Sequence, residues 1–267
     1  MSLSFLADKP CPAVIAMLHV PALPGTPRAA LSMHDICDHV RREAAVYAEH
    51  GVDAVMLENM HDVPYLKATA GPEITACMTA AALAAREAFA GPMGVQVLAG
   101  ANHAALAVAL AAALQFVRVE GFVFGHVADE GWLDACAGEL LRLRRHLGCD
   151  HVAVLADLKK KHAAHAATAD VSLAETVRAA AFCGADGVIV TGEATGQITA
   201  PDAVHEALDA AALPVLVGSG VTVENLPAYA RAHGVIVGSY LKARGVWAGP
   251  VEAGRVEQLM AAVHAMR

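Results

Sequence analysis

The chain has 267 residues, of which 56% are hydrophobic, 17% charged and 4% aromatic, and its formal net charge is −8. This composition excludes a mainly disordered chain, and the negative charge argues against nucleic acid as a partner. The longest uninterrupted apolar run, Ala104 to Leu114, is too short to cross a bilayer, which takes about 20 residues. No basic segment precedes an apolar stretch at the N-terminus. We therefore expect a cytoplasmic protein without a transmembrane segment.

Eight short apolar runs alternate along the chain with stretches of helical periodicity, such as the stripe Ile36, Val40, Ala44 and Tyr47. A further helix is expected between the last two runs, from about Val223 to His233. Repeated alternation predicts a parallel sheet, and eight units predict a single-domain (β/α)8 TIM barrel over residues 1–267. A doubly wound open sheet is the alternative, although no G-x-G-x-x-G motif follows the first run. The runs are Ala13–Leu18, Val52–Leu57, Gly94–Leu98, Phe116–Val119, Val152–Leu155, Gly187–Val190, Val215–Val217 and Val235–Val237.

Polar residues follow most of these runs, at the strand ends where barrel enzymes carry their catalytic groups. A buried carboxylate is unfavourable unless it is paired. These residues therefore form either an internal ion-pair network, for example Arg118 with Glu58 or Glu120, or a catalytic set. Lys160 is expected to lie in a solvated basic loop. The residues at the strand ends are His19, Glu58, Asn59, Arg118, Glu120, Asp157, Lys161 and His162.

The last two apolar runs end in nearly the same way, in Gly218-Ser219-Gly220 and in Gly238-Ser239. Small residues let backbone N–H groups approach an anion closely. The loops after strands 7 and 8 are the usual phosphate site of a barrel. We expect these two Gly-Ser corners to bind phosphate, together with Thr191-Gly192, His19 and Asn59.

No cofactor is predicted from the sequence. The 14 His and six Cys show no C-x-x-C or other supported metal-binding spacing, so the cysteines are interpreted as free thiols in a reducing compartment. A divalent cation held by Glu58 and Asp157 is the alternative that these carboxylates leave open.

Five motifs in chain order resemble the BtpA/SgcQ family. They are Met17–Gly25, Glu58-Asn59-x-x-Asp62-Val63-Pro64, Ala156-Asp157-x-x-x-Lys161-His162, Val190-Thr191-Gly192-x-x-Thr195-Gly196 and Gly218–Thr222. The resemblance covers nearly the whole chain and implies a phosphate-binding TIM barrel. The family takes its name from a cyanobacterial factor that photosystem I needs in order to accumulate.

Two functions are expected from these observations. The first is an enzyme that acts on a small phosphorylated metabolite, a sugar phosphate or a nucleotide-like compound, by isomerase, epimerase or lyase chemistry. In it Asp157 is the acid or base, Lys161 and His162 polarise or orient the substrate, and Glu58 and Arg118 complete the barrel mouth. The alternative is a non-enzymatic assembly factor for a membrane complex such as photosystem I. A homo-oligomer is expected on general grounds.

Overall fold

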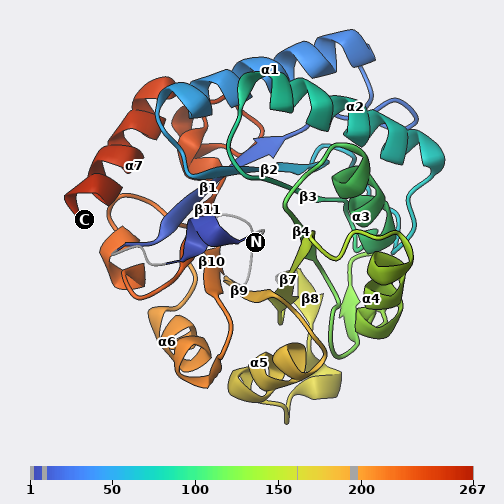
Figure 1. The fold of residues 1–267 in the computed structure, drawn as a ribbon, viewed down its shortest axis with the longest axis vertical. Coiled ribbons are helices and arrows are strands. Elements are labelled where there is room, and N and C mark those ends of the chain that lie inside the picture. The colour runs from blue at the N-terminus through green and yellow to red at the C-terminus, as the bar shows by residue number, and fades with distance from the viewer. Residues whose placement is uncertain (1–2, 8–10, 161, 193–197, 267) are drawn as a thin grey trace.

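Eight parallel strands close into a barrel in the computed structural model, which describes residues 3–7, 11–160, 162–192 and 198–266 (Figure 1). The order around the barrel is β1-β11-β10-β9-β7-β4-β3-β2. The predicted barrel is therefore confirmed, and the predicted strand ends differ from those observed by at most three residues. The strands are β1 (Ala13–His19), β2 (Ala54–Glu58), β3 (Met93–Gln96), β4 (Phe116–Val119), β7 (Ala153–Leu158), β9 (Gly187–Thr191), β10 (Val215–Gly218) and β11 (Gly234–Val237).

The strands are apolar along both faces because one face fills the barrel interior and the other packs under helices. Nearly every strand residue is buried. The register determines which carboxyl-terminal residues become neighbours. His19 of β1 lies opposite Glu58 of β2, and Gly218 of β10 lies opposite Thr191 of β9.

In the described part of the chain, seven α-helices surround the barrel (Figure 1). Ser32 caps the N-terminus of the first helix, because its side chain accepts a hydrogen bond from the Asp35 amide. Ser172 caps α5 by accepting from the Glu175 amide. Apolar side chains of the barrel strands and of the surrounding helices form one layer between the barrel and the helices. The helices are α1 (Met33–Glu49), α2 (Pro72–Ala88), α3 (Asn102–Ala111), α4 (Ala137–His146), α5 (Leu173–Phe182), α6 (Pro201–Ala210) and α7 (Ala253–Ala265).

The helix predicted for residues 223–233 is wrong, since only a short 3₁₀ helix, Leu226–Tyr229, follows β10. Pro227 lacks an N–H for a helical bond. The Asn225 side chain instead binds the Thr222 amide and the Gly220 carbonyl, which offers the backbone a turn in place of a helix.

A three-stranded antiparallel sheet, which the sequence did not reveal, lies beside the barrel. Its strands are β5 (His126–Ala128), β6 (Gly131–Leu133) and β8 (Ala163–Ala164). The first two follow β4 and the third follows β7, so the sheet joins two loops at the carboxyl end of the barrel.

The opposite, amino end of the barrel is filled by apolar side chains. Leu6 and Phe5 from an N-terminal turn pack on the interior cluster, with the Phe5 and Phe116 rings 5.8 Å apart between centroids. A ligand therefore has access to the barrel axis from the carboxyl end. Among the described helices, none combines the length and apolar character needed to cross a membrane.

Candidate functional site

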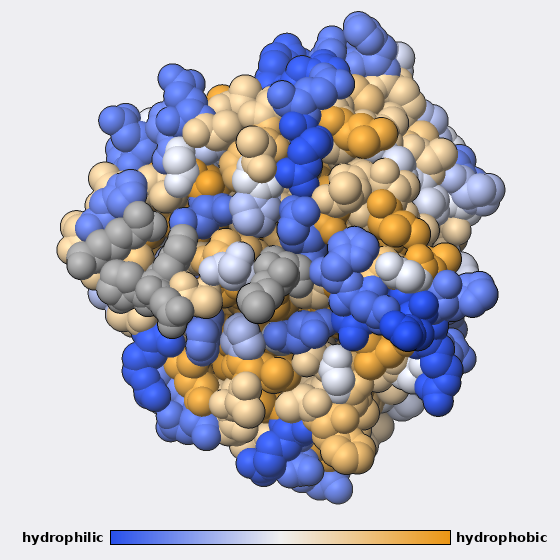
Figure 2. Space-filling view, in the orientation of Figure 1, coloured by the Kyte–Doolittle hydropathy of each residue, from blue (hydrophilic) through white to orange (hydrophobic). Residues whose placement is uncertain are grey.

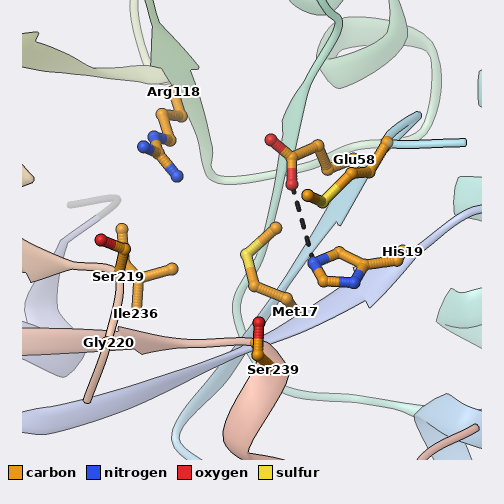
Figure 3. A pocket seen from close by; sticks show the side chains of 10 residues that line it. Met17, His19, Glu58, Arg118, Ser219, Gly220, Ile236 and Ser239 are labelled. Carbon is orange, nitrogen blue, oxygen red and sulfur yellow. Dashed lines mark ion pairs between the residues drawn. The ribbon is translucent and has the colours of Figure 1, made fainter. Parts of the chain in front are cut away.

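A small cavity of about 40 Å³, which we call the anchor cavity, lies at the carboxyl ends of β1, β2, β4, β10 and β11. Glu58, Arg118 and His19 point into it from one side, and Ser219 and Ser239 face them from the other (Figure 3). The structure thus brings together seven of the residues expected from the sequence to form the site, these five and two glycines. Gly220 and Gly238 complete its wall.

The carbonyl oxygens of the first Gly-Ser corner are bound by side chains that do not line this cavity. The Thr199 hydroxyl donates to the Gly218 and Ser219 carbonyls at 3.2 and 3.3 Å, and the Asn225 amide donates to the Gly220 carbonyl at 2.7 Å. Since the C=O and N–H of one trans peptide point in opposite directions, the N–H groups of Ser219 and Gly220 face away from Thr199. Both residues have positive φ, +87° and +68°, which produces this sharp turn.

In the second Gly-Ser corner, too, a hydrogen-bonded carbonyl determines the direction of the next N–H group. The Gly238 carbonyl accepts from the Leu241 amide, which turns the Ser239 N–H in the opposite direction. A Cβ added to Gly238 would lie 3.2 Å from two atoms of the His19 ring, so a larger residue here would press on that ring.

A larger cavity of about 400 Å³, the rim cavity, adjoins the anchor cavity because both share Gly220, Gly238 and Ser239. Arg255 from the first turn of α7 lines it and stacks on Tyr240, with its guanidinium carbon 4.5 Å from the ring centroid. The sequence analysis missed Arg255. A cation in the first turn of a helix opposes the helix dipole, and this mismatch was the available signal.

Arg118 and Asp157 form a buried ion pair. The Arg118 Nε lies 2.9 and 3.1 Å from the two Asp157 carboxylate oxygens, and both side chains are almost fully buried. Burial alone would lower the pKa of Arg118, but Asp157 and Glu58 outweigh it and raise that pKa. The predicted partner of Arg118, Glu58 or Glu120, is therefore wrong, because the neighbouring strand β7 supplies Asp157 instead.

A second buried pair corrects the expectation for Lys160. This residue is only 7% exposed, and its Nζ lies 3.2 Å from a Glu120 carboxylate oxygen. Burial raises the pKa of Glu120, and Lys160 opposes that shift. Lys160 is thus turned inward to compensate a carboxylate rather than solvated.

His19 is held as a neutral imidazole with a defined tautomer. Its Nδ1 lies 3.0 Å from the Trp247 carbonyl, which can only accept, so Nδ1 carries the proton. Burial, with a smaller contribution from the Lys242 charge, lowers the pKa of His19 to about 3. Its Nε2 is therefore a proton acceptor, and it faces a Glu58 oxygen at 3.7 Å (Figure 3).

This low pKa predicts a specific loss of stability in acid. A histidine in an unfolded chain has a pKa of about 6.5, so between that value and about pH 3 the unfolded chain binds a proton that folded His19 does not. Stability is therefore greatest above pH 6.5 and falls as the pH drops through this window. We expect a shallower fall for His19→Gln, measured by urea unfolding from pH 7 to pH 4. Equal pH slopes would contradict the neutral state of His19.

The remaining expected residues lie in other surroundings. Asn59 uses its Nδ2 on Asp62 and its Oδ1 on the Leu98 amide, and it lines neither the anchor nor the rim cavity. Thr191 lies beside Gly218 with its hydroxyl buried and without a hydrogen-bond partner among the described residues. Gly192 follows it and is buried. Lys161, like Thr195-Gly196 of the fourth motif, lies outside the described residues.

Metal binding has no preassembled ligand set in the described part of the chain. No group of three or more His, Cys, Asp or Glu side chains there is placed to hold an ion. Both carboxylate oxygens of Asp157 face Arg118, so the suggested Glu58–Asp157 pair would have to compete with this cation.

Comparisons with known proteins agree with this architecture. An uncharacterised mitochondrial protein of Caenorhabditis elegans is 46% identical over 99% of this chain and 97% of its own length. The photosystem I biogenesis protein BtpA of Synechocystis is 34% identical over 87% of this chain and 81% of its own length. The crystal structure of phosphoribosyl anthranilate isomerase from Thermus thermophilus superimposes with a TM-score of 0.57 at 16% identity, covering 96% of this chain and 100% of that one, which shows a shared barrel fold. The model of the BtpA family matches residues 10–265, and the chain therefore belongs to this family.

Proposed function

We propose that this protein is an enzyme that acts on a small phosphorylated metabolite, a sugar phosphate or a nucleotide-like compound, by isomerase, epimerase or lyase chemistry. The main support is that the two Gly-Ser corners and the buried groups His19, Glu58 and Arg118 line one cavity. The name of the structurally similar isomerase, which acts on a phosphoribosyl compound, is consistent with this class of ligand. We treat residues 1–267 as one catalytic domain.

The corners supply the phosphate anchor in this proposal. N–H groups of Ser219, Gly220 and Ser239 face the anion, and Arg255 adds a positive charge at the rim. Because His19 is neutral and its Nε2 has no proton, it accepts a ligand hydroxyl and does not contribute positive charge.

Proton transfer is assigned to Glu58. Its carboxylate lies at the wall of the cavity, whereas both oxygens of Asp157 face Arg118. Asp157 then acts as a positioning residue that fixes the Arg118 guanidinium, Glu58 acts as the general base, and the neutral His19 orients a ligand hydroxyl. The roles of Lys161 and His162, the cytoplasmic location and the homo-oligomeric state stay predictions.

The test is thermal unfolding with added inorganic phosphate, sugar phosphates and nucleotides, compared with chloride at equal ionic strength. A ligand that binds only the folded state raises the stability, by about 2.7 kcal/mol at a hundredfold excess over its Kd. Gly238→Asp places a carboxylate against His19 and should abolish the increase. Gly138→Asp is the matched control, since it adds the same charge at an exposed position of α4. If no phosphorylated compound stabilises the native protein, the proposal fails.

A non-enzymatic assembly factor is the second candidate, because the Synechocystis relative is named for photosystem I biogenesis. Such a role needs a docking surface. On the face shown in Figure 2, hydrophilic residues interrupt the hydrophobic ones. Binding of phosphorylated compounds without any turnover, together with capture of a membrane complex, would favour this candidate over the enzyme.

A further inference from the structure

A third cavity, of about 210 Å³, adjoins the anchor cavity on the side away from the rim. The two share Glu58 and Arg118. Its other walls come from the ends of β3 and β4 and from the β5–β6 turn, which contribute Gln96, Glu120 and Glu130. We call it the acceptor cavity for the following reason.

The two cations that line this cavity already have partners. Arg118 Nε is bound to Asp157, and the Lys160 ammonium lies 3.2 Å from Glu120. The Nη2 of Arg118 lies toward the first Gly-Ser corner, since a Cβ built on Gly218 would be 3.8 Å from it. Four carboxylates line the cavity against these two cations, so its net charge is negative.

Several groups around the same cavity lack partners among the described residues. The Glu130 Oε2 is buried and without a hydrogen bond, as is the Oε1 of Gln96, whose side chain is only 2% exposed. At the boundary with the anchor cavity, the Glu58 carboxylate and the His19 Nε2 face each other at 3.7 Å, and both are acceptors. A buried acceptor without a donor is unfavourable, and a ligand that supplies O–H or N–H groups would satisfy these acceptors.

We propose that the acceptor cavity binds the hydroxyl- or ammonium-bearing end of a phosphorylated ligand and rejects a carboxylate at that end. The inference rests on the proposed function and names its substrate class, which is phosphorylated polyols, sugars or amino sugars rather than phosphorylated acids. A hydroxyl or ammonium group donates to Glu58 and Glu130, whereas a carboxylate meets four side chains of like charge and only two cations, Arg118 and Lys160, which are already paired with carboxylates.

Matched ligand pairs test this directly by isothermal titration calorimetry on the full chain. Glycerol 3-phosphate differs from 3-phosphoglycerate, and glucitol 6-phosphate from 6-phosphogluconate, only at the end distal to the phosphate, where a CH2OH group replaces the carboxylate. We expect the alcohol of each pair to bind at least about tenfold more tightly than the acid. Equal or tighter binding of both acids overturns the inference.

Inorganic phosphate separates this inference from the function on which it rests. Failure of phosphate and all four esters to bind overturns the proposed function. Binding of phosphate together with acids that equal the alcohols overturns only the acceptor cavity as a donor-selective subsite.

Substitutions of cavity residues test which side chains cause the preference for the alcohol over the acid. Glu58→Gln removes the central charge, and Glu130→Gln removes one on a partly exposed turn, where folding is least at risk. Each should bring the affinities for the acid and the alcohol at least about threefold closer. Glu139→Gln, an exposed glutamate of α4, is the matched control and should leave the ratio unchanged. Unchanged ratios in both cavity variants would overturn the assignment.

Discussion

Asp157→Asn is expected to lower the free energy of unfolding by about 3 kcal/mol. The substitution keeps the shape of the side chain and one acceptor for Arg118 Nε, but it removes the carboxylate in direct contact with the buried guanidinium, leaving the more distant Glu58 and Glu120 as counter-charges. Removing one partner of a buried pair typically costs about 3–5 kcal/mol, and the retained acceptor places this variant at the lower end. Urea unfolding followed by circular dichroism measures the change.

Asp150→Asn supplies the control for this experiment. Asp150 pairs with Arg145 at 2.8 Å, but the two side chains are 50% and 82% exposed. Water screens such a pair, so the same chemical change should alter stability little. Similar losses of unfolding free energy in both variants would show that burial does not strengthen the contribution of the Arg118–Asp157 pair to stability.

Lys242→Met is expected to destabilise the protein by a similar amount, about 3 kcal/mol. The Lys242 ammonium is 1% exposed and lies 2.7 Å from a Glu43 oxygen, while the second Glu43 oxygen accepts from the Val251 amide. Burial lowers the pKa of Lys242, and Glu43 opposes that shift. Loss of the ammonium leaves a carboxylate of α1 buried with one backbone donor.

A double-mutant cycle with Glu43→Leu distinguishes charge from packing. The double variant carries no buried charge at this place, so it should be more stable than the sum of the two single changes predicts. Additive losses would contradict the pairing. The loop fixed by this pair also carries Trp247, whose carbonyl orients His19, so the single variant should weaken phosphate binding as well.

The barrel itself was predictable because buried parallel strands are continuous apolar runs. Phe116–Val119 has the same limits in sequence and structure. The β5–β6 hairpin escaped notice because each strand has three residues, too few to establish an alternating pattern.

The members of the site were more predictable than their partners. Glycines and polar residues at strand ends marked the mouth, but ion pairs depend on side-chain geometry across neighbouring strands. The sequence alone does not distinguish which of Lys159, Lys160 and Lys161 is buried. The turn at Lys159, with φ of +43°, coincides with the inward placement of Lys160, and no local pattern encodes that choice.

The pairing of β1 with β11 determines when the site can form as the chain folds. Ala13 pairs with Gly234 across this seam, and the His19–Trp247 hydrogen bond joins residues 228 positions apart. During synthesis on the ribosome, the first strand has to wait for the last one before barrel closure, and the anchor cavity comes into existence at that same moment. The phosphorylated ligand that we propose for this cavity would contact both the first and the last barrel strands, so its release and the opening of the seam would be thermodynamically linked.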